Sequence, residues 1–550
     1  MNLLHEPWMP VRLSDGRREW IAPSRLSDPA VVAFDADRAD FNGALAQFAI
    51  GLLQTCSPAQ TQLQWKRLFE NPPDADTLQE WFEPHSSAFV LDGDGARFMQ
   101  DFELRTGSGE TIEAGGLLVG FPIKDTADHN KDHFIKHDRY RFLCPHCAAL
   151  ALFTKQVTGQ AGGRGYRTGL RGGGPLTTLL IADPESGTIS TLWSTLWLNV
   201  VDQGTIRHIG GDDDLQDACY TFPWMSNIRV IQRSDEWEVS PSLVHPMHAY
   251  WGMQNRIRLD FEQVSEGDCG VCSRPSERLI QKYVTRNYGF NYKGPWRHPL
   301  SPYYKGKDGM LPVHAQPGGL GYQHWLGLVL GSSDGKDLTE PALVVSDYFS
   351  SVAKSRSGVS GFRLWAAGYD IENAKTRCWY EATMPLYDLT NCDTPIQSAV
   401  REVVTTWING ASLASGYLVK SVKDAWFKRD ARGKFDHIDA SFWSRTEGDF
   451  YRLLQLLISA ARSDSSTPPL NLSGQWIGLL QKHVMALFET EWVGTGMIER
   501  QNPARVAKAR KELRDKLYGP KLRAALALKV EAKPAKKKPG KANPATKSTQ

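Results

Sequence analysis

The sequence contains no long apolar segment, either at its start or elsewhere. Residues 1–7 carry neither the basic stretch nor the hydrophobic stretch of a secretory signal. No apolar run approaches the roughly 20 residues that a membrane-spanning helix needs. We therefore expect a cytoplasmic protein that has no membrane partner.

The sequence also contains few cysteines and has a small net charge. Eight cysteines in 550 residues do not make a disulfide framework, and they indicate a reducing compartment. The formal net charge is +3, but residues 529–550 contain seven lysines and one acid, an excess of six positive charges, which leaves about −3 for the rest. The body of the chain is therefore not generally basic, and any contact with phosphate must come from a local patch.

Recognisable catalytic motifs are missing too. The sequence has no nucleophile elbow, no HExxH and no clear carboxylate pair, and the glycine-rich segment 162–174 is neither a P-loop nor a GxGxxG motif. This absence favours a binding protein over an enzyme. A metal-dependent nuclease that uses the run Asp212–Asp214 and the nearby His208 stays open as an alternative, although such a run is more often a solvated turn.

Two Cys-x-x-Cys pairs are the clearest signal that the sequence does contain. They are Cys144 and Cys147, and Cys269 and Cys272. Four thiolates close a tetrahedral zinc site and leave no position for a catalytic water, so the zinc would be structural. We expect Gly270 to permit a tight turn in the second pair. Four buried thiols without metal, or His146 as a ligand in place of one cysteine, are the alternatives.

A glycine-rich segment follows the first cysteine pair. Residues 162–174 contain two glycine clusters with arginines between them. The arginines are Arg164, Arg167 and Arg171. Glycine lets backbone N–H groups come close to a ligand, and the arginines favour an anion. The segment therefore predicts contact with a nucleic-acid groove or phosphate, with a flexible surface loop as the alternative.

The periodicity of apolar residues predicts an α+β protein. Residues 1–390 are predicted to form a large mixed α/β domain with a four-cysteine zinc-knuckle site and the glycine loop. Residues 395–528 read as a four-helix bundle, and residues 529–550 as a disordered Lys-rich tail. The bundle helices are predicted at 396–427, 439–461, 473–492 and 503–528.

The larger domain shows mixed local patterns. A hairpin is predicted around Asp15-Gly16, and a polar turn that leads into a strand from Gly368. Helices are predicted at 41–56, 61–69 and 76–82. Strands are predicted at 176–183, 256–261, 342–346 and 361–365.

Several blocks, in this order, resemble the CasA family, the large subunit of the type I-E CRISPR surveillance complex Cascade. The blocks are residues 1–4, 8–12, 144–153, 169–178, 269–272, 296–302 and 368–381. The resemblance implies the same mixed α/β domain followed by a four-helix bundle.

The resemblance also implies a function without catalysis. Such a subunit binds other Cascade subunits and the 5′ end of the CRISPR guide RNA, and recognises the protospacer-adjacent motif in double-stranded target DNA. It helps to open the duplex and recruits the helicase–nuclease. The guide then reads the sequence by base pairing. A structural scaffold that does not touch DNA is a further alternative.

Site residues follow from the resemblance by position. The family's DNA-contacting lysine corresponds to Asn287, so that contact is absent or passes to Arg286 or Lys293. The glycine loop corresponds to Gly162, Gly163, Arg164 and Gly165, with Arg164 in place of a family glycine. The wedge that splits the first base pairs corresponds to Glu372, Asn373 and Ala374, with Asn373 in place of glutamine and a plain β-turn as the alternative. The loop that binds the guide RNA and neighbouring subunits corresponds to 121–142, with Lys124, Lys131 and Lys136 as contact candidates.

Overall fold

The computed structural model describes most of the chain, in two compact units. The described residues are 1–122, 129, 137–159, 165, 167–183, 190–227, 238–307, 309–332, 338–352, 361–372, 375–387, 389, 392, 394–427, 433, 435–463, 471–494 and 502–529. Unit 1 comprises Met1–Arg401 and Ala461–Ser465, and unit 2 comprises Glu402–Ala460 and Ser466–Gln550. The chain is a mixed α+β protein with a C-terminal helical region, as the sequence predicts.

Unit 1 begins with the predicted hairpin. Strands β1 (Met9–Leu13) and β2 (Arg18–Ile21) are antiparallel, and β3 (Val31–Phe34) pairs with the other edge of β1. Gly16 in the turn has φ +86°, a conformation that glycine adopts without strain. The hairpin prediction is confirmed.

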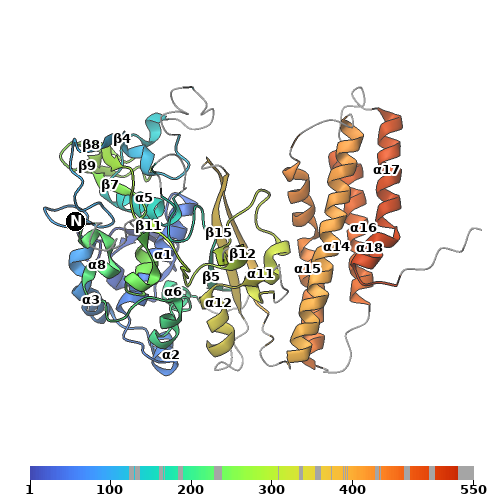
Figure 1. Ribbon diagram of the computed structural model, residues 1–550, viewed down its shortest axis with the longest axis horizontal. Coiled ribbons are helices and arrows are strands. Elements are labelled where there is room, and N and C mark those ends of the chain that lie inside the picture. The colour runs from blue at the N-terminus through green and yellow to red at the C-terminus, as the bar shows by residue number, and fades with distance from the viewer. Residues whose placement is uncertain are drawn as a thin grey trace, which may run out of the picture. The chain divides into compact units, whose positions relative to one another are not determined.

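Helix α1 (Ala39–Cys56) forms the centre of the core of unit 1. The Phe48 side chain is fully buried, and its ring makes edge-on contacts at centroid distances of 5.1–5.8 Å. Its ring partners are Trp8, Phe89, Phe98, Phe153 and Trp251. Through Phe153, α1 packs against α5 (Pro145–Thr158), the helix that follows the first cysteine pair (Figure 1).

The two short helices predicted after α1 are also confirmed. Helix α2 (Gln62–Glu70) starts with a capping box at Thr61, and α3 (Ala75–Phe82) is capped by the Asp74 carboxylate. In the part of unit 1 that the structure describes, the remaining short α-helices are α6 (Leu192–Trp197), α7 (Gln203–Ile206), α8 (Ala218–Thr221), α10 (His248–Trp251), α11 (Trp325–Val329) and α12 (Leu343–Asp347).

A three-stranded antiparallel sheet is joined in the chain to a hairpin, and the turn of the hairpin contains the second cysteine pair. The sheet order is β4 (Glu110–Glu113), β10 (Lys282–Arg286) and β7 (Arg256–Leu259). The hairpin, β8 (Val264–Asp268) and β9 (Pro275–Ile280), lies in the chain between β7 and β10. The smaller strands are β6 (Glu238–Val239), β11 (Asn291–Tyr292), β12 (Tyr303–Gly306), β13 (Gly309–Pro312) and β14 (Thr339–Glu340).

A second antiparallel sheet contains the longest strands of the chain (Figure 1). Its order is β16 (Lys375–Pro385), β15 (Phe362–Glu372) and β5 (Thr177–Ala182). The predicted strands at 176–183 and 361–365 are confirmed, but the polar turn expected from Gly368 is wrong. Gly368 lies opposite Tyr380 in the ladder, and pairing continues to Glu372 and Lys375, because the polar residues of β16 occupy exposed or half-exposed positions of a strand pair.

The strand predicted at 342–346 is also wrong. These residues belong to α12, with Val344 and Val345 buried. A short apolar run fits a buried helical turn as well as a buried strand, so its composition alone does not decide between them.

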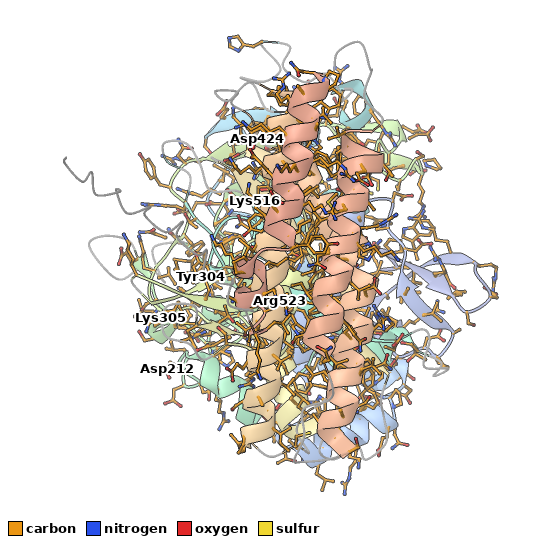
Figure 2. The ribbon with its side chains drawn as sticks, turned by 90° about the vertical axis from the view of Figure 1, so that its right-hand side faces the viewer. Asp212, Tyr304, Lys305, Asp424, Lys516 and Arg523 are labelled. Carbon is orange, nitrogen blue, oxygen red and sulfur yellow. The ribbon has the colours of Figure 1, made fainter. Side chains whose placement is uncertain are left out.

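Unit 2 is helical. Its helices are α14 (Thr394–Trp426), α15 (Asp436–Ser463), α16 (Leu472–Ala486), α17 (Pro503–Leu517) and α18 (Pro520–Ala525). The rings of Trp407, Phe450 and Trp476 meet in the core, and the Trp476 indole donates to the Trp407 carbonyl at 3.1 Å. Figure 2 shows Lys516 of α17 and Arg523 of α18.

The helix predicted over 503–528 is interrupted. It ends at Leu517, and Gly519 has an extended backbone before Pro520 starts α18. Proline has no N–H to donate and disfavours helical geometry in the residue before it, so the break is local in origin. In the part of the chain that the structure describes, no helix has the length and apolar character needed to cross a membrane.

Candidate metal centre and nucleic-acid interface

The two cysteine pairs lie at the ends of regular elements. Cys144 is the N-cap of α5, and its sulfur accepts a hydrogen bond from the Cys147 N–H at 3.5 Å. The second pair lies in the turn between β8 and β9. There the Cys269 N–H donates to the Arg274 carbonyl at 2.9 Å, and Ser273 adopts a left-handed φ of 56°.

Backbone contacts bring the two pairs together. Leu143 and Ile280 exchange two backbone hydrogen bonds of 3.1 and 2.8 Å. The Gly270 N–H donates to the Phe142 carbonyl at 2.8 Å, and a Cβ at Gly270 would lie 2.0 Å from the Arg139 carbonyl oxygen. The expected role of Gly270 is thus corrected: glycine is needed there for close approach of two backbones, while the left-handed turn residue is Ser273.

The four sulfurs form a compact cluster. All lie within 4.8 Å of one another, and the sulfurs of Cys144 and Cys272 are 3.8 Å apart. A tetrahedral site with metal–sulfur bonds of about 2.3 Å has sulfur–sulfur edges of about 3.8 Å, so the cluster has the size of such a site. His146, the alternative ligand, does not belong to the cluster.

Hydrogen bonding favours the thiolate form at one side of the cluster. The thiols of Cys144 and Cys147 hold the pKa of Cys269 well below its usual range. The same two thiols lower the pKa of Cys272. Buried negative charge needs compensation, and a divalent cation bound to all four sulfurs would supply it. The residues present therefore fit a metal that prefers sulfur ligands.

Part of the glycine loop can be placed. Gly162, Gly163 and Arg164 lie outside the described residues. Gly165 has φ +90°, and its carbonyl accepts a hydrogen bond from the Tyr288 N–H at 2.8 Å. A Cβ at Gly165 would lie 2.7–2.8 Å from side-chain atoms of Asn287. Gly165 of the glycine loop thus lies beside Asn287, the position that corresponds to the family's DNA-contacting lysine.

The end of β10 and the chain that follows it present exposed side chains. Arg286, Asn287 and Tyr288 are exposed, and so is Lys293, whose backbone N–H is fixed to the Val239 carbonyl at 2.9 Å. The sequence analysis missed Tyr288 as an individual residue. The only signal for it was the high density of aromatic residues between 285 and 304.

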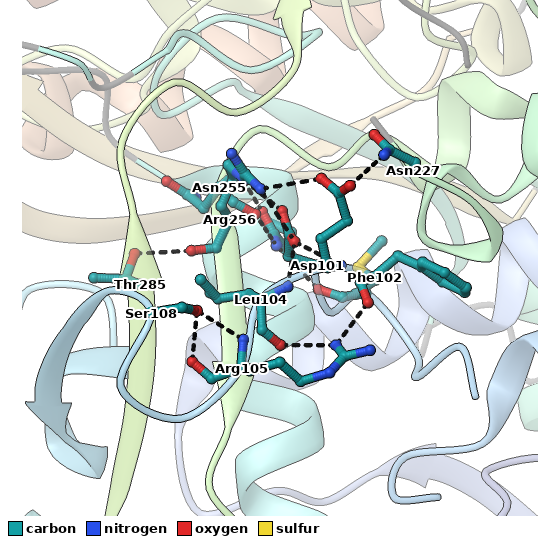
Figure 3. Close-up of polar contacts among 12 residues, drawn as sticks. Asp101, Phe102, Leu104, Arg105, Ser108, Asn227, Asn255, Arg256 and Thr285 are labelled. Carbon is teal, nitrogen blue, oxygen red and sulfur yellow. Dashed lines mark hydrogen bonds and ion pairs between the residues drawn. The ribbon is translucent and has the colours of Figure 1, made fainter. Parts of the chain in front are cut away.

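A polar network is connected to β10 through Thr285 (Figure 3). The Thr285 hydroxyl donates to the Arg256 carbonyl at 2.9 Å. The Arg256 guanidinium pairs with Asp101 at 2.5 Å and with Glu103 at 3.7 Å, and the Asn227 amide also donates to Glu103. The exposed residues therefore extend from an anchored strand.

The second half of the glycine segment is structural, which corrects the expected role of Arg171. That side chain is buried and donates to Ser301, Gln47 and Thr177 at 2.8, 2.5 and 2.8 Å. Burial lowers the pKa of Arg171 to about 10. Its hydrogen bonds are used inside the protein, so this arginine is not available to an external anion.

The end of the glycine segment lies against β15, close to the tip of the hairpin that β15 forms with β16. Gly174 has φ +70°, and a Cβ there would lie 2.8 Å from the Ile371 side chain. Glu372 is exposed and pairs with Arg377, which also binds Asp370 at 2.6 Å. Asn373 and Ala374, at the tip, lie outside the described residues.

The start of loop 121–142 lies near the same hairpin. A Cβ at Gly120 would contact the Thr376 methyl group at 3.6 Å. Lys124, Lys131 and Lys136, the guide-RNA candidates, lie outside the described residues.

The acidic run of the alternative nuclease site is engaged locally. The Asp213 carboxylate pairs with Arg207 at 3.0 Å, and the Asp212 carboxylate accepts from the Asp214 N–H at 3.0 Å. The side chain of His208 is not among those described. Among the described residues, only the four cysteines form a group of three or more metal-binding side chains.

Comparison with known proteins identifies the family and the fold. The model of the family described as CRISPR-associated protein Cse1 (CRISPR_cse1) matches residues 2–482. The crystal structure of Thermobifida fusca Cse1 is similar, with a TM-score of 0.66 at 14% identity over 96% of this chain and 98% of that one. Cse1 from Acidimicrobium ferrooxidans gives 0.60 at 17% identity, over 96% and 98%. A chain of a structure described as a CRISPR RNA-guided surveillance complex gives 0.66 at 17% identity, over 94% and 99%.

Proposed function

The chain belongs to the Cse1 (CasA) family, the large subunit of the type I-E surveillance complex, and we propose that it recognises the protospacer-adjacent motif of target DNA within that complex. It then helps to open the duplex so that the guide RNA can pair, and it recruits the helicase–nuclease. Its partners are the other Cascade subunits, the 5′ end of the guide RNA and double-stranded DNA.

The observation that carries this proposal is the contact between Gly165 and Asn287. Two segments more than a hundred residues apart meet at an exposed surface, and by resemblance one is the glycine loop and the other holds the position of the family's DNA-contacting lysine. Glycines let the backbone of Gly162–Gly165 approach the minor groove, whose degenerate pattern suits tolerant recognition of a short motif. Arg286 and Lys293 add phosphate contacts, which position the duplex without reading its sequence.

The hairpin of β15 and β16 acts as the wedge. Its two strands are paired up to Glu372 and Lys375, with one irregularity between Asp370 and Ile371, so the ladder holds the chain on both sides of Asn373 and Ala374. A side-chain amide inserted at the end of the motif can replace hydrogen bonds of the first base pair. The lysines of loop 121–142 contact the guide RNA in this proposal.

Zinc occupies the cysteine cluster in a structural role. Cys144, Cys147, Cys269 and Cys272 supply four sulfurs and leave no ligand position for substrate. The metal holds the start of α5 to the turn between β8 and β9. The C-terminal helices form a four-helix bundle, whose basic residues hold flanking DNA with an affinity that falls as salt rises.

Motif-dependent binding by the assembled complex tests the proposal. We would compare the wild type with Gly163→Asp and Asn373→Ala on duplexes with and without the motif, at fixed salt. Gly163→Asp should abolish the preference for the motif, because a carboxylate would face phosphates. The matched control is Gly95→Asp, at a glycine with no atom within 4 Å of its Cβ position. An unchanged preference for the motif in both Gly163→Asp and Asn373→Ala, with assembly intact, would refute the proposal.

A further inference from the structure

Tyr288 combines exposure with a restrained backbone. Its side chain is 57% exposed, although it is large and aromatic. Its φ is +61°, in the left-handed region that residues other than glycine, asparagine and aspartate rarely adopt. Such a conformation persists only where the surroundings impose it, and it is common at functional sites.

Contacts on both sides of Tyr288 impose this conformation. Its N–H donates to the Gly165 carbonyl at 2.8 Å, which ties it to the glycine loop. The next residue, Gly289, lies directly against the backbone of Gln254. A Cβ at this position would lie 2.0 Å from the Gln254 carbonyl oxygen. On the other side, β10 is anchored through Thr285 to Arg256 (Figure 3). The aromatic ring is therefore presented from a fixed point rather than from a free loop.

One face of the ring already has a partner. The guanidinium carbon of Arg167 lies 5.5 Å from the ring centroid, at a distance typical of a cation–π contact. Arg286 and Asn287, directly before Tyr288, are exposed as well. An exposed aromatic ring with cationic and amide side chains beside it has the composition of a platform for unpaired nucleobases.

We propose that Tyr288 stacks on a nucleobase that leaves the duplex when target DNA is opened beside the glycine loop. This inference rests on the proposed function and adds to it a residue that holds the opened strand. Arg167 supports the ring from one side, and the base covers the exposed remainder. Stacking does not depend on base identity, because every base has a π-face, so Tyr288 stabilises opening without changing the motif.

The test measures opening in the assembled complex with 2-aminopurine placed in the DNA next to the motif. Tyr288→Ala should reduce the opened fraction roughly tenfold, in the range that one base–aromatic stack supports, and keep the preference for the motif. Tyr288→Trp should restore opening. The control is Tyr518→Ala, which removes a tyrosine of similar exposure, 59%, from the C-terminal helices.

Tyr288→Gly separates stacking from folding. Glycine adopts φ +61° without strain, so this variant should have an unchanged or higher melting temperature and still lose opening. Opening at the wild-type level in both Tyr288→Ala and Tyr288→Gly would overturn the inference. So would weaker assembly with other subunits at unchanged opening, which would make Tyr288 a protein contact. Asn373→Ala distinguishes the two levels: if it also leaves opening unchanged, the proposed function itself fails.

Discussion

The cysteine cluster and the surface around Gly165 both join segments that are far apart in the chain, but they do so in opposite ways. At the cluster, Cys144, Cys147 and Cys269 are buried, and every sulfur faces another sulfur. At the surface, the backbone hydrogen bond from Tyr288 to Gly165 makes the junction, and the side chains of Asn287 and Tyr288 stay exposed beside it. The first arrangement buries its side chains in the fold, and the second leaves them exposed, as the proposed contact with DNA requires.

This difference predicts two opposite orders of effect. Changes in the cluster should cost much stability and affect DNA only through folding. Changes at the surface should cost little stability and affect DNA directly.

Removing one cysteine ligand should have the largest effect. Cys269→Ser should lower the free energy of unfolding by more than about 3 kcal/mol, because loss of a structural metal removes its binding energy from folding. Elemental analysis should find one zinc per wild-type chain and much less in the variant. Cys378→Ser, at an exposed cysteine, is the control. Wild-type protein that contains no metal and keeps its melting temperature in chelator would contradict this prediction.

The core of unit 1 gives an intermediate effect through pH. Burial lowers the pKa of His248 to about 4 from its ordinary value of 6.5, and the ring is held by the Tyr220 carbonyl and the Tyr292 hydroxyl. Its contribution is fully present above pH 6.5 and is lost as pH falls toward 4, since the unfolded state takes up the proton first. The loss is about 3 kcal/mol.

Chemical denaturation at several pH values measures this contribution. His248→Gln should flatten the decline of unfolding free energy between pH 6.5 and 4. An equally steep decline in the variant would show that other groups cause it.

Gly165→Ala should have a smaller effect on stability and a large effect on motif-dependent DNA binding. The left-handed φ and the close approach of Asn287 together should cost about 2 kcal/mol. Gly107 has φ +83° and no atom within 4 Å of its Cβ position, so Gly107→Ala isolates the backbone term, about 1 kcal/mol. Thermal unfolding measures both costs. Equal costs would mean that Asn287 moves away freely, and the proposed junction would be loose.

Arg286→Gln should have the smallest effect on stability, within about 0.5 kcal/mol, because its side chain is exposed. It should weaken DNA binding similarly with and without the motif. The slope of log affinity against log salt should fall in magnitude by about 1, as expected for one lost phosphate contact. Binding titrations at several salt concentrations provide the measurement, and an unchanged slope would remove Arg286 from the interface.

The regular parts of the fold could be predicted from the sequence, because local rules determine them. The period of α1 and the turn at Gly16 are examples, and the two cysteine pairs predicted a cluster that the structure brings together. Local rules fail where two structures fit one pattern. Residues 342–346 suit a strand or a buried helical turn, and only the tertiary context decides.

The site was harder to predict, because the residue type does not determine whether a side chain is exposed. Arg171 and Arg167 stand four residues apart in the same glycine-rich stretch. One is buried among Gln47 and Ser301, and the other lies over an exposed ring. The importance of Tyr288 depends on its backbone conformation and on contacts with Gly165 and Gln254, which no sequence pattern reveals.

In the proposed function this subunit performs two steps, recognition of a motif and opening of the duplex, and one experiment separates them. Formation of the guide–target hybrid would be measured with the wild type and Asn373→Ala, on a fully paired duplex and on one already unpaired next to the motif. We predict that the variant is defective on the paired duplex and equal to the wild type on the unpaired one. Equal activity of the variant on both duplexes, or an equal defect on both, would contradict the account.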